Sequence, residues 1–297
     1  MRSIVGYSKS IVEIIERRFS CRTYLDVPIE AEKRQRLGEF LSACRTGPLG
    51  TATRFELVVA TEKDRRALRG LGTYGLIRGA TGFVLGAVSE GEKNLEDFGY
   101  LMEQIVLQAT DLGLGTCWLG GSFTRSRFAE RMALDDRELM PAVVSVGYMS
   151  DDRGLVDRLI RRGAGSDKRL PWERLFFDGQ FGVPISCQAA GAYAVPLEMV
   201  RLGPSASNRQ PWRIVKDGDA WHFYLQRMLG YYEGGRLFLR MADLQRVDMG
   251  IAMCHFALTA DELGLRGAWA IEEPDIKRPD ESTEYVVSWV EGRSNGL

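Results

Sequence analysis

The hydrophobic residues of this chain recur at two spacings, which predict alternating helices and strands. Apolar side chains three or four residues apart indicate helices, whereas short continuous apolar runs between glycine, proline or polar residues indicate buried strands. On this basis we expect helices over 11–19, 30–44, 62–71 and 97–112, and strands over 55–60, 81–88 and 140–149. The pattern predicts an α+β protein.

The second half of the sequence repeats the pattern of the first. Three landmarks recur 151 residues later, Asp97 as Asp248, Gly113 as Gly264 and Trp118 as Trp269. A Gly-Pro pair before a strand and a Val-Val-Ser run near the end also occur in both halves. We therefore predict two diverged copies of one α+β unit, residues 1–180 and 181–297, joined through 176–184 and packed as a pseudo-dimer. The alternative is that helix–glycine–strand patterns, common in α/β proteins, match here by chance.

Composition narrows the class of protein. Among the 297 residues, 39 Lys and Arg balance 40 Asp and Glu, giving a net charge of −1, which argues against a nucleic-acid-binding role. No apolar run reaches the roughly 18 residues of a membrane helix, and the first residues lack a signal-peptide core. The five cysteines are odd in number and never form a CxxC motif. We therefore expect a cytoplasmic protein with no membrane or nucleic-acid partner.

The side chains that usually carry catalysis or bind metals are scarce. The two histidines, His222 and His255, stand at no metal-ligand spacing, and no GxSxG motif marks a nucleophile. If the protein is an enzyme, we expect a cofactor to supply the reactive group.

Two segments offer hydrogen bonds to a ligand. In the first, Arg18, Ser20 and Arg22 place charge-assisted donors close together, as phosphate binding requires. The alternative is the solvated basic end of a helix. In the second, Pro204, Ser205, Ala206, Ser207 and Asn208 combine short polar side chains with an open backbone. The alternative is an ordinary helix-to-strand turn.

Two further segments are less specific. After the expected helix over 97–112, Leu119, Gly120 and Gly121 present a backbone that suits the polar edge of a planar ring. A helix cap followed by a buried strand is the alternative. Lys168 and Arg169 lie in a basic stretch over 158–174, for which an exposed charged loop is the alternative.

In this order, the four segments resemble the FMN-dependent nitroreductase family, and most closely its putative TM nitroreductase branch, which joins two nitroreductase-like halves in one chain. The similarity covers residues 11–292 and implies an α+β sandwich with a mainly antiparallel central sheet and a flavin at the interface of two protomers. By this resemblance, phosphate and ribityl contacts come from Arg18, Ser20, Arg22, Lys168 and Arg169. The isoalloxazine is bordered by Leu119, Gly120 and Gly121, and approached from the other half by Pro204, Ser205, Ala206, Ser207 and Asn208.

The chain departs from this family in ways that affect the number of sites. Phe19 stands where a second arginine is common, and the first-half loop over 47–55 lacks the Asn-x-Gln-Pro-Trp run found after Ser207. In the second half, Glu272 and Glu273 follow the strand at which the first half carries its glycine pair, and they would repel a phosphate. We therefore predict one FMN per chain.

The resemblance also implies an activity. NADH or NADPH would reduce the flavin and leave, and a nitroaromatic, quinone or similar small-molecule acceptor would then enter, with hydride transfer through flavin N5 and no catalytic side chain. Tyr231 and Tyr232 are candidates to stack against the acceptor, or are ordinary core or surface aromatics. The alternative function is a flavin-binding protein without turnover. Whether the chain acts as a pseudo-dimeric monomer or as a homodimer stays open.

Overall fold

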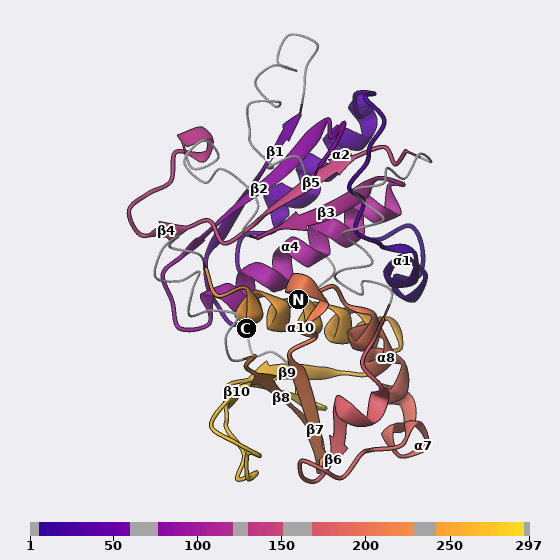
Figure 1. Cartoon of the computed structure of the whole chain (residues 1–297), viewed down its shortest axis with the longest axis vertical. Coiled ribbons are helices and arrows are strands. Elements are labelled where there is room, and N and C mark those ends of the chain that lie inside the picture. The colour runs from indigo at the N-terminus through magenta and orange to yellow at the C-terminus, as the bar shows by residue number, and fades with distance from the viewer. Residues whose placement is uncertain (1–5, 60–76, 121–129, 151–167, 229–241, 294–297) are drawn as a thin grey trace.

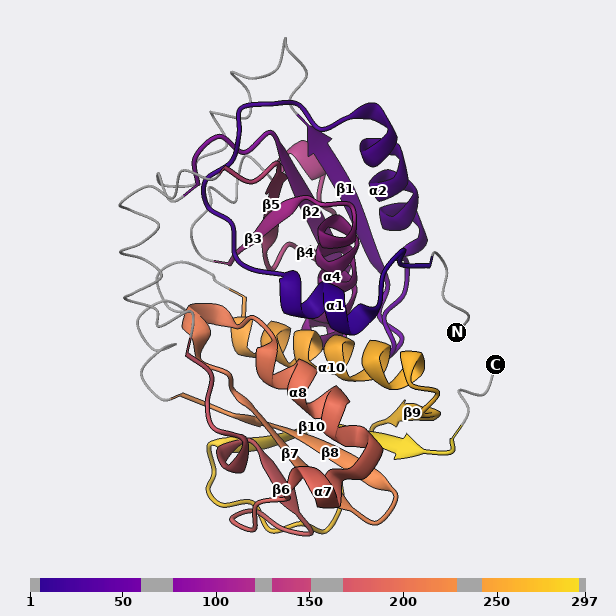
Figure 2. The same ribbon diagram turned by 90° about the vertical axis from the view of Figure 1, so that its right-hand side faces the viewer.

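A computed structural model describes residues 6–59, 77–120, 130–150, 168–228 and 242–293. Within them, two helix-and-sheet halves lie one above the other, with the long helices α4 (Asn94–Asp111) and α10 (Leu244–Glu262) between the two sheets (Figure 1). The side view shows α10 running the width of this boundary, with α1 above it and α8 below it (Figure 2). The expected helix over 62–71 and the residues Gly121, Tyr231 and Tyr232 lie outside the described residues.

The first half contains an antiparallel sheet with strand order β1-β2-β5-β3, to which the short strand β4 adds by pairing with β2. Its strands are β1 (Thr53–Val59), β2 (Gly82–Ser89), β3 (Gly115–Leu119), β4 (Glu138–Leu139) and β5 (Val143–Gly147). Its other helices among the described residues are α1 (Ile11–Arg17) and α2 (Ala31–Ala43). The sheet is buried on both faces because α2 and α4 pack on one side and a second apolar cluster covers the other.

The second half contains a sheet with strand order β6-β7-β8-β10-β9, in which only the β6–β7 pair is parallel. Its strands are β6 (Phe176–Asp178), β7 (Trp212–Asp217), β8 (Ala220–Gln226), β9 (Gly267–Ala270) and β10 (Thr283–Glu291). In the part of this half that the structure describes, the remaining helical segments are η1 (Trp172–Arg174), α7 (Cys187–Ala190), η2 (Gly191–Tyr193), α8 (Ala194–Leu202) and η3 (Ala206–Asn208). Phe176 and Phe177 are buried in this sheet, so the start of the expected linker over 176–184 is a strand instead.

The two central helices cross at a pair of glycines. A Cβ atom added to Gly99 would collide with the carbonyl oxygen of Val247, and one added to Gly250 would collide with that of Glu96. Gly99 and Gly250 are themselves 151 residues apart. Their missing side chains allow the backbones of α4 and α10 to touch, which brings the two halves into direct contact.

Equivalent elements of the two halves occupy equivalent places. The antiparallel order β1-β2-β5-β3 matches β7-β8-β10-β9, and α4 and α10 precede β3 and β9 in the same way. Both helices end in a glycine with positive φ, +77° at Gly113 and +71° at Gly264, a conformation that an L side chain disfavours. The common order is what a repeated unit predicts, and its origin by duplication stays a prediction.

Helix α1 joins the halves on a second side. Its buried residues Ile11, Ile14 and Ile15 contact an apolar cluster that includes Leu107 from α4 and Met199 from α8. At its start, the backbone N–H of Ile11 donates to Glu262 Oε1 at the end of α10, 2.7 Å away. This packing fixes the direction in which the chain leaves α1 toward residues 18–22.

Candidate functional site

A cavity of about 300 Å³ lies at the boundary between the two halves. The first half contributes Ser20, Arg22, Cys117, Trp118, Gly120 and Ala142 to its lining, and the second half contributes Pro204, Ser205, Ala206, Ser207, Leu244, Val247, Asp248 and Ile251. This volume is at the lower end of the range for pockets that hold ligands of drug size. Three of the four segments selected from the sequence therefore reach a single cavity.

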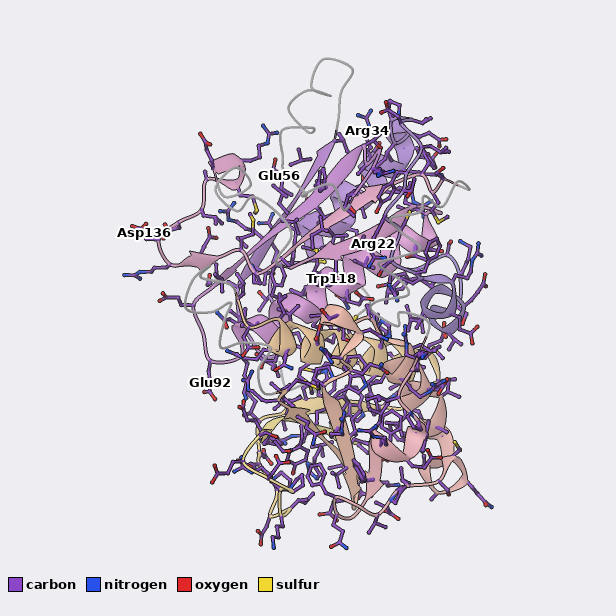
Figure 3. The ribbon with its side chains drawn as sticks, in the orientation of Figure 1. Arg22, Arg34, Glu56, Glu92, Trp118 and Asp136 are labelled. Atoms are coloured by element: carbon purple, nitrogen blue, oxygen red, sulfur yellow. The ribbon has the colours of Figure 1, made fainter. Side chains whose placement is uncertain are left out.

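Residues 18–22 reach the cavity by running beside β3. Ser20 forms a parallel bridge with Thr116, and the backbone N–H of Cys21 donates to the Thr116 carbonyl oxygen 2.8 Å away. This pairing places the side chain of Arg22 at the cavity, near Trp118 of β3 (Figure 3).

Helix α10 supplies one wall of the cavity. The four lining residues Leu244, Val247, Asp248 and Ile251 follow one another at intervals of three, one and three positions, so they share one helix face. Gly120 lies directly against the side chain of Leu244, leaving no room for a Cβ atom. The apolar part of this face forms a surface suited to a flat, uncharged ring.

The loop between α8 and β7 supplies a further part of the lining beside α10, in a strained backbone conformation. Ser207, Asn208 and Gln210 all have positive φ, at +51°, +56° and +50°, a region that non-glycine residues seldom occupy. The N–H of Gln210 donates to Ser205 Oγ at 2.8 Å, which closes the loop. Backbone strain of this kind persists only where surrounding contacts impose it, and it is typical of ligand sites.

Asp248 is the main contact that holds this loop from α10. Its carboxyl oxygens lie 3.0 and 3.1 Å from the backbone nitrogen of Ala206, which donates to them. The side chain is buried, and this burial raises its pKa well above the ordinary value. The sequence analysis used Asp248 only as a landmark of the repeat. An acidic residue on an otherwise apolar helix face was the feature that could have indicated a site residue here.

Lys168 and Arg169 lie behind the loop rather than in the cavity lining. Arg169 Nη1 donates to Asn208 Oδ1 at 3.1 Å, and Arg169 Nη2 donates to the carbonyl oxygen of Leu202 at 3.1 Å. Asn208 Nδ2 donates in turn to the carbonyl oxygen of Lys168 at 2.8 Å. The basic stretch and the serine loop are thus brought together, with Asn208 as the link between them.

Two other residues selected from the sequence are not part of the cavity lining. Leu119 is buried in the apolar cluster that covers the face of the first sheet opposite α2 and α4. Arg18 is also buried, with 5% of its side chain exposed, and its Nε lies 3.9 Å from Glu103 Oε1. The spacing of residues 18, 20 and 22 gave no indication that Arg18 turns inward.

The described residues contain no cluster of three or more histidine, cysteine or acidic side chains arranged to hold a metal ion. Every helix in the same residues is too short or too polar to cross a bilayer.

The antiparallel sheets, with long helices between them and a cavity at the boundary of two similar halves, define the nitroreductase fold. The chain belongs to the putative TM nitroreductase family, whose sequence profile it matches over residues 10–260.

A solved structure of a putative nitroreductase from Thermotoga maritima MSB8 has 20% sequence identity and a TM-score of 0.58, with 96% of this chain and 95% of that chain covered. Two smaller proteins match about half of this chain. One is a putative nitroreductase from Desulfovibrio desulfuricans in complex with FMN, which is 23% identical, with 51% of this chain and 95% of that chain covered and a TM-score of 0.38. The other is a nitroreductase with bound FMN from Bacteroides fragilis, which is 21% identical, with 50% of this chain and 92% of that chain covered and a TM-score of 0.38. No curated protein matches the chain.

Proposed function

We propose that this chain is an FMN-dependent NAD(P)H oxidoreductase of nitroreductase type, with FMN held in the cavity between its halves. One observation carries the proposal: the arginine-bearing segment of the first half and the serine loop of the second half line the same cavity. Membership of a nitroreductase family supports the same class of chemistry.

The residues of the cavity fit the chemical parts of FMN. Arg22 and Ser20 offer a cation and a hydroxyl donor, which suit a phosphate. Trp118, Val247 and Ile251 provide aromatic and aliphatic surface, which suits the isoalloxazine ring. A cavity with a cationic part and an apolar part selects a planar ring system that carries an anionic tail.

The placement of the other predicted residues defines their proposed roles. Gly120 and the backbone of residues 204–207 approach the polar edges of the ring, and Gly121 keeps this role by resemblance alone. Lys168, Arg169 and Asn208 support the loop from behind. Leu119 contributes packing of β3 to the core.

When bound, FMN supplies two-step transfer of reducing equivalents, from NADH or NADPH to a nitroaromatic, quinone or similar small acceptor that enters after the nicotinamide has left. The chain's own residues bind and orient: Arg22 anchors the charged end, and the strained loop is held rigidly by Asp248 and Ser205. The apolar face of α10 excludes water from one side of the cavity.

The proposed site predicts different effects for two neighbouring arginines. We expect Arg22→Ala to weaken FMN binding about 10-fold to 100-fold, because it removes a charge-assisted hydrogen bond worth about 1.5–3 kcal/mol. Arg17→Ala is the matched control, since the Arg17 side chain is 61% exposed and pairs with Glu13 on the surface. Fluorescence titration of FMN-free protein measures both dissociation constants, and equal affinity in the two variants would contradict the site.

The visible spectrum of the purified protein separates the enzyme from the flavin-binding alternative. We expect one FMN per chain, a yellow colour that bleaches with NADH or NADPH, and its return when a quinone or nitroaromatic is added. A colour that persists with both nicotinamides would favour a binding protein without turnover. Two FMN per chain would contradict the single site.

A further inference from the structure

A buried polar cluster lies behind the wall of the cavity and joins both halves. At its centre is Glu103 of α4, whose side chain is 0% exposed. Glu103 Oε2 accepts a hydrogen bond from Trp118 Nε1 at 2.8 Å, and Glu103 Oε1 lies 3.1 Å from His255 Nε2. Arg18 Nε, 3.9 Å from the same oxygen, supplies a positive charge. A buried carboxyl group is costly unless it is paired in this way.

The hydrogen bonds of this cluster determine which nitrogen of His255 carries a hydrogen and which oxygen of Glu103 accepts from Trp118. His255 Nδ1 lies 2.8 Å from the carbonyl oxygen of Met199, which only accepts, so Nδ1 carries a hydrogen. The contact between His255 Nε2 and Glu103 Oε1 then holds one proton, on either atom. The other oxygen, Oε2, is left as the acceptor for the indole N–H of Trp118. Glu103 is therefore fixed by α10 on one side and fixes Trp118 on the other.

The internal repeat supplies a comparison for this contact. Trp269 is the counterpart of Trp118, but the residue 151 positions after Glu103 is Cys254. Trp269 Nε1 is buried without a hydrogen-bond partner among the described residues, and the ring packs against Phe223 and Trp289. The carboxyl anchor thus occurs in the half whose tryptophan lines the cavity.

We propose that Glu103 is a positioning residue for the cofactor site: it holds the indole of Trp118 in the orientation that forms the cavity wall, and His255 and Arg18 hold Glu103. Glu103 itself is outside the cavity lining and acts only through Trp118. This inference rests on the proposed function, since the ligand that meets Trp118 is taken to be FMN. It extends that function by assigning a role to a histidine and an acid that the flavin chemistry does not use.

Four variants test the inference through FMN affinity and the visible spectrum of the bound flavin. Trp118→Phe keeps an aromatic ring and removes its N–H donor; Trp269→Phe is the matched control. Glu103→Met removes the acceptor at similar length, whereas Glu103→Gln keeps an oxygen for Trp118 and an amide N–H for His255 Nε2. We expect Trp118→Phe and Glu103→Met each to raise the FMN dissociation constant about fivefold and to shift the flavin bands. Trp269→Phe and Glu103→Gln should stay within twofold of the parent.

The double variant Glu103→Met with Trp118→Phe shows whether the two residues act as one unit. We expect the FMN dissociation constant of the double variant to be no higher than the higher of the two single-variant values, because both changes remove the same contact. Multiplying effects would mean that Glu103 acts independently of Trp118 and would overturn the inference. If Glu103→Met does not fold, equal affinity in Trp118→Phe and Trp269→Phe would overturn it instead. If the parent protein binds no FMN, the proposed function is refuted together with the inference. If the parent binds FMN and one of the contradicting results above is obtained, only the inference is refuted.

Discussion

The two halves of the molecule share a framework but differ where they meet the cavity. In both, an aspartate of the central helix accepts backbone hydrogen bonds from the loop that follows a Gly-Pro pair. Asp97 accepts from the N–H groups of Leu49 and Thr51, both at 2.8 Å, and Asp248 accepts from that of Ala206. Only the second of these loops contributes to the cavity described above, and it contains three non-glycine residues with positive φ.

This comparison separates contacts that both halves share from contacts that we propose to serve a ligand. The glycine crossing and the helix-terminating glycines occur in both halves, so they belong to the shared framework. Arg22, the strained serine loop and the Glu103–Trp118 pair each occur on one side. The cavity is therefore asymmetric although the two halves share an order of elements, because each half supplies a different part of its lining.

The largest expected effect distinguishes Arg18 from Arg22. Arg18→Ala leaves the buried Glu103 without its guanidinium neighbour, so we expect a loss of about 3 kcal/mol in the free energy of unfolding. Arg22→Ala should change this free energy by less than about 0.5 kcal/mol while weakening FMN binding. Urea unfolding of the FMN-free proteins gives both values. Equal stabilities would show that Arg18 does not support the core.

The next effect tests whether the glycine crossing is symmetric. We expect Gly99→Ala and Gly250→Ala each to lower the free energy of unfolding by about 2 kcal/mol, because each new Cβ meets a backbone carbonyl that cannot move alone. Gly38→Ala in α2 is the control, with no atom within 4 Å of its Cβ position, and should gain about 0.5 kcal/mol. Thermal or urea unfolding measures all three. A loss at only one central glycine would mean that the helices pack unequally.

The smallest effect compares the two aspartates through pH. Burial raises the pKa of Asp97, and raises that of Asp248 further, so in each case the folded chain binds a proton more tightly than the unfolded chain. Stability from these groups is therefore present at low pH and falls as pH rises above the ordinary aspartate range, by at most about 1.4 kcal/mol per pH unit.

Asn variants remove this titration while keeping an oxygen acceptor for the loop. As pH rises from 4.5 to 8, we expect the free energy of unfolding of the parent to fall relative to that of Asp248→Asn. For Asp97→Asn the shift should be smaller and should end at a lower pH. In the parent, Asp97 accepts two backbone hydrogen bonds, which offset part of the pKa rise caused by burial. Urea unfolding across this pH range measures both. Parallel stability curves for parent and variants would contradict the raised pKa values.

Much of the fold could be predicted from the sequence because its elements are locally encoded. The expected helices over 11–19, 30–44 and 97–112 correspond to α1, α2 and α4, and the strand over 81–88 corresponds to β2. Strand β6 was missed because it has only three residues and ends at Asp178, directly before Gly179, and an Asp-Gly pair is typical of a turn. Its pairing partner, β7, lies more than thirty residues away, so no local pattern could reveal it.

The sequence predicted which segments meet at the cavity, but not which of their side chains line it. Ser20, Arg22, Gly120 and residues 204–207 meet at the cavity, as polar and glycine-rich segments in a repeated fold suggested. Arg18 and Leu119 are not part of the cavity lining: Arg18 lies beside the buried Glu103, and Leu119 belongs to an apolar cluster of the first sheet. Side-chain direction depends on the partners that each residue finds, which spacing alone does not contain.

The sequence by itself determined the periodic elements, the constant separation of 151 residues between corresponding positions of the halves, and the arginine, serine and glycine segments that we propose to meet FMN. These follow from local propensity and residue chemistry. Only the tertiary structure decided that α10 presents Asp248 to the loop and that Glu103 meets Trp118 and His255. The contact between Glu103 and His255 joins residues 152 positions apart, on the two helices whose backbones pack directly against each other at Gly99 and Gly250.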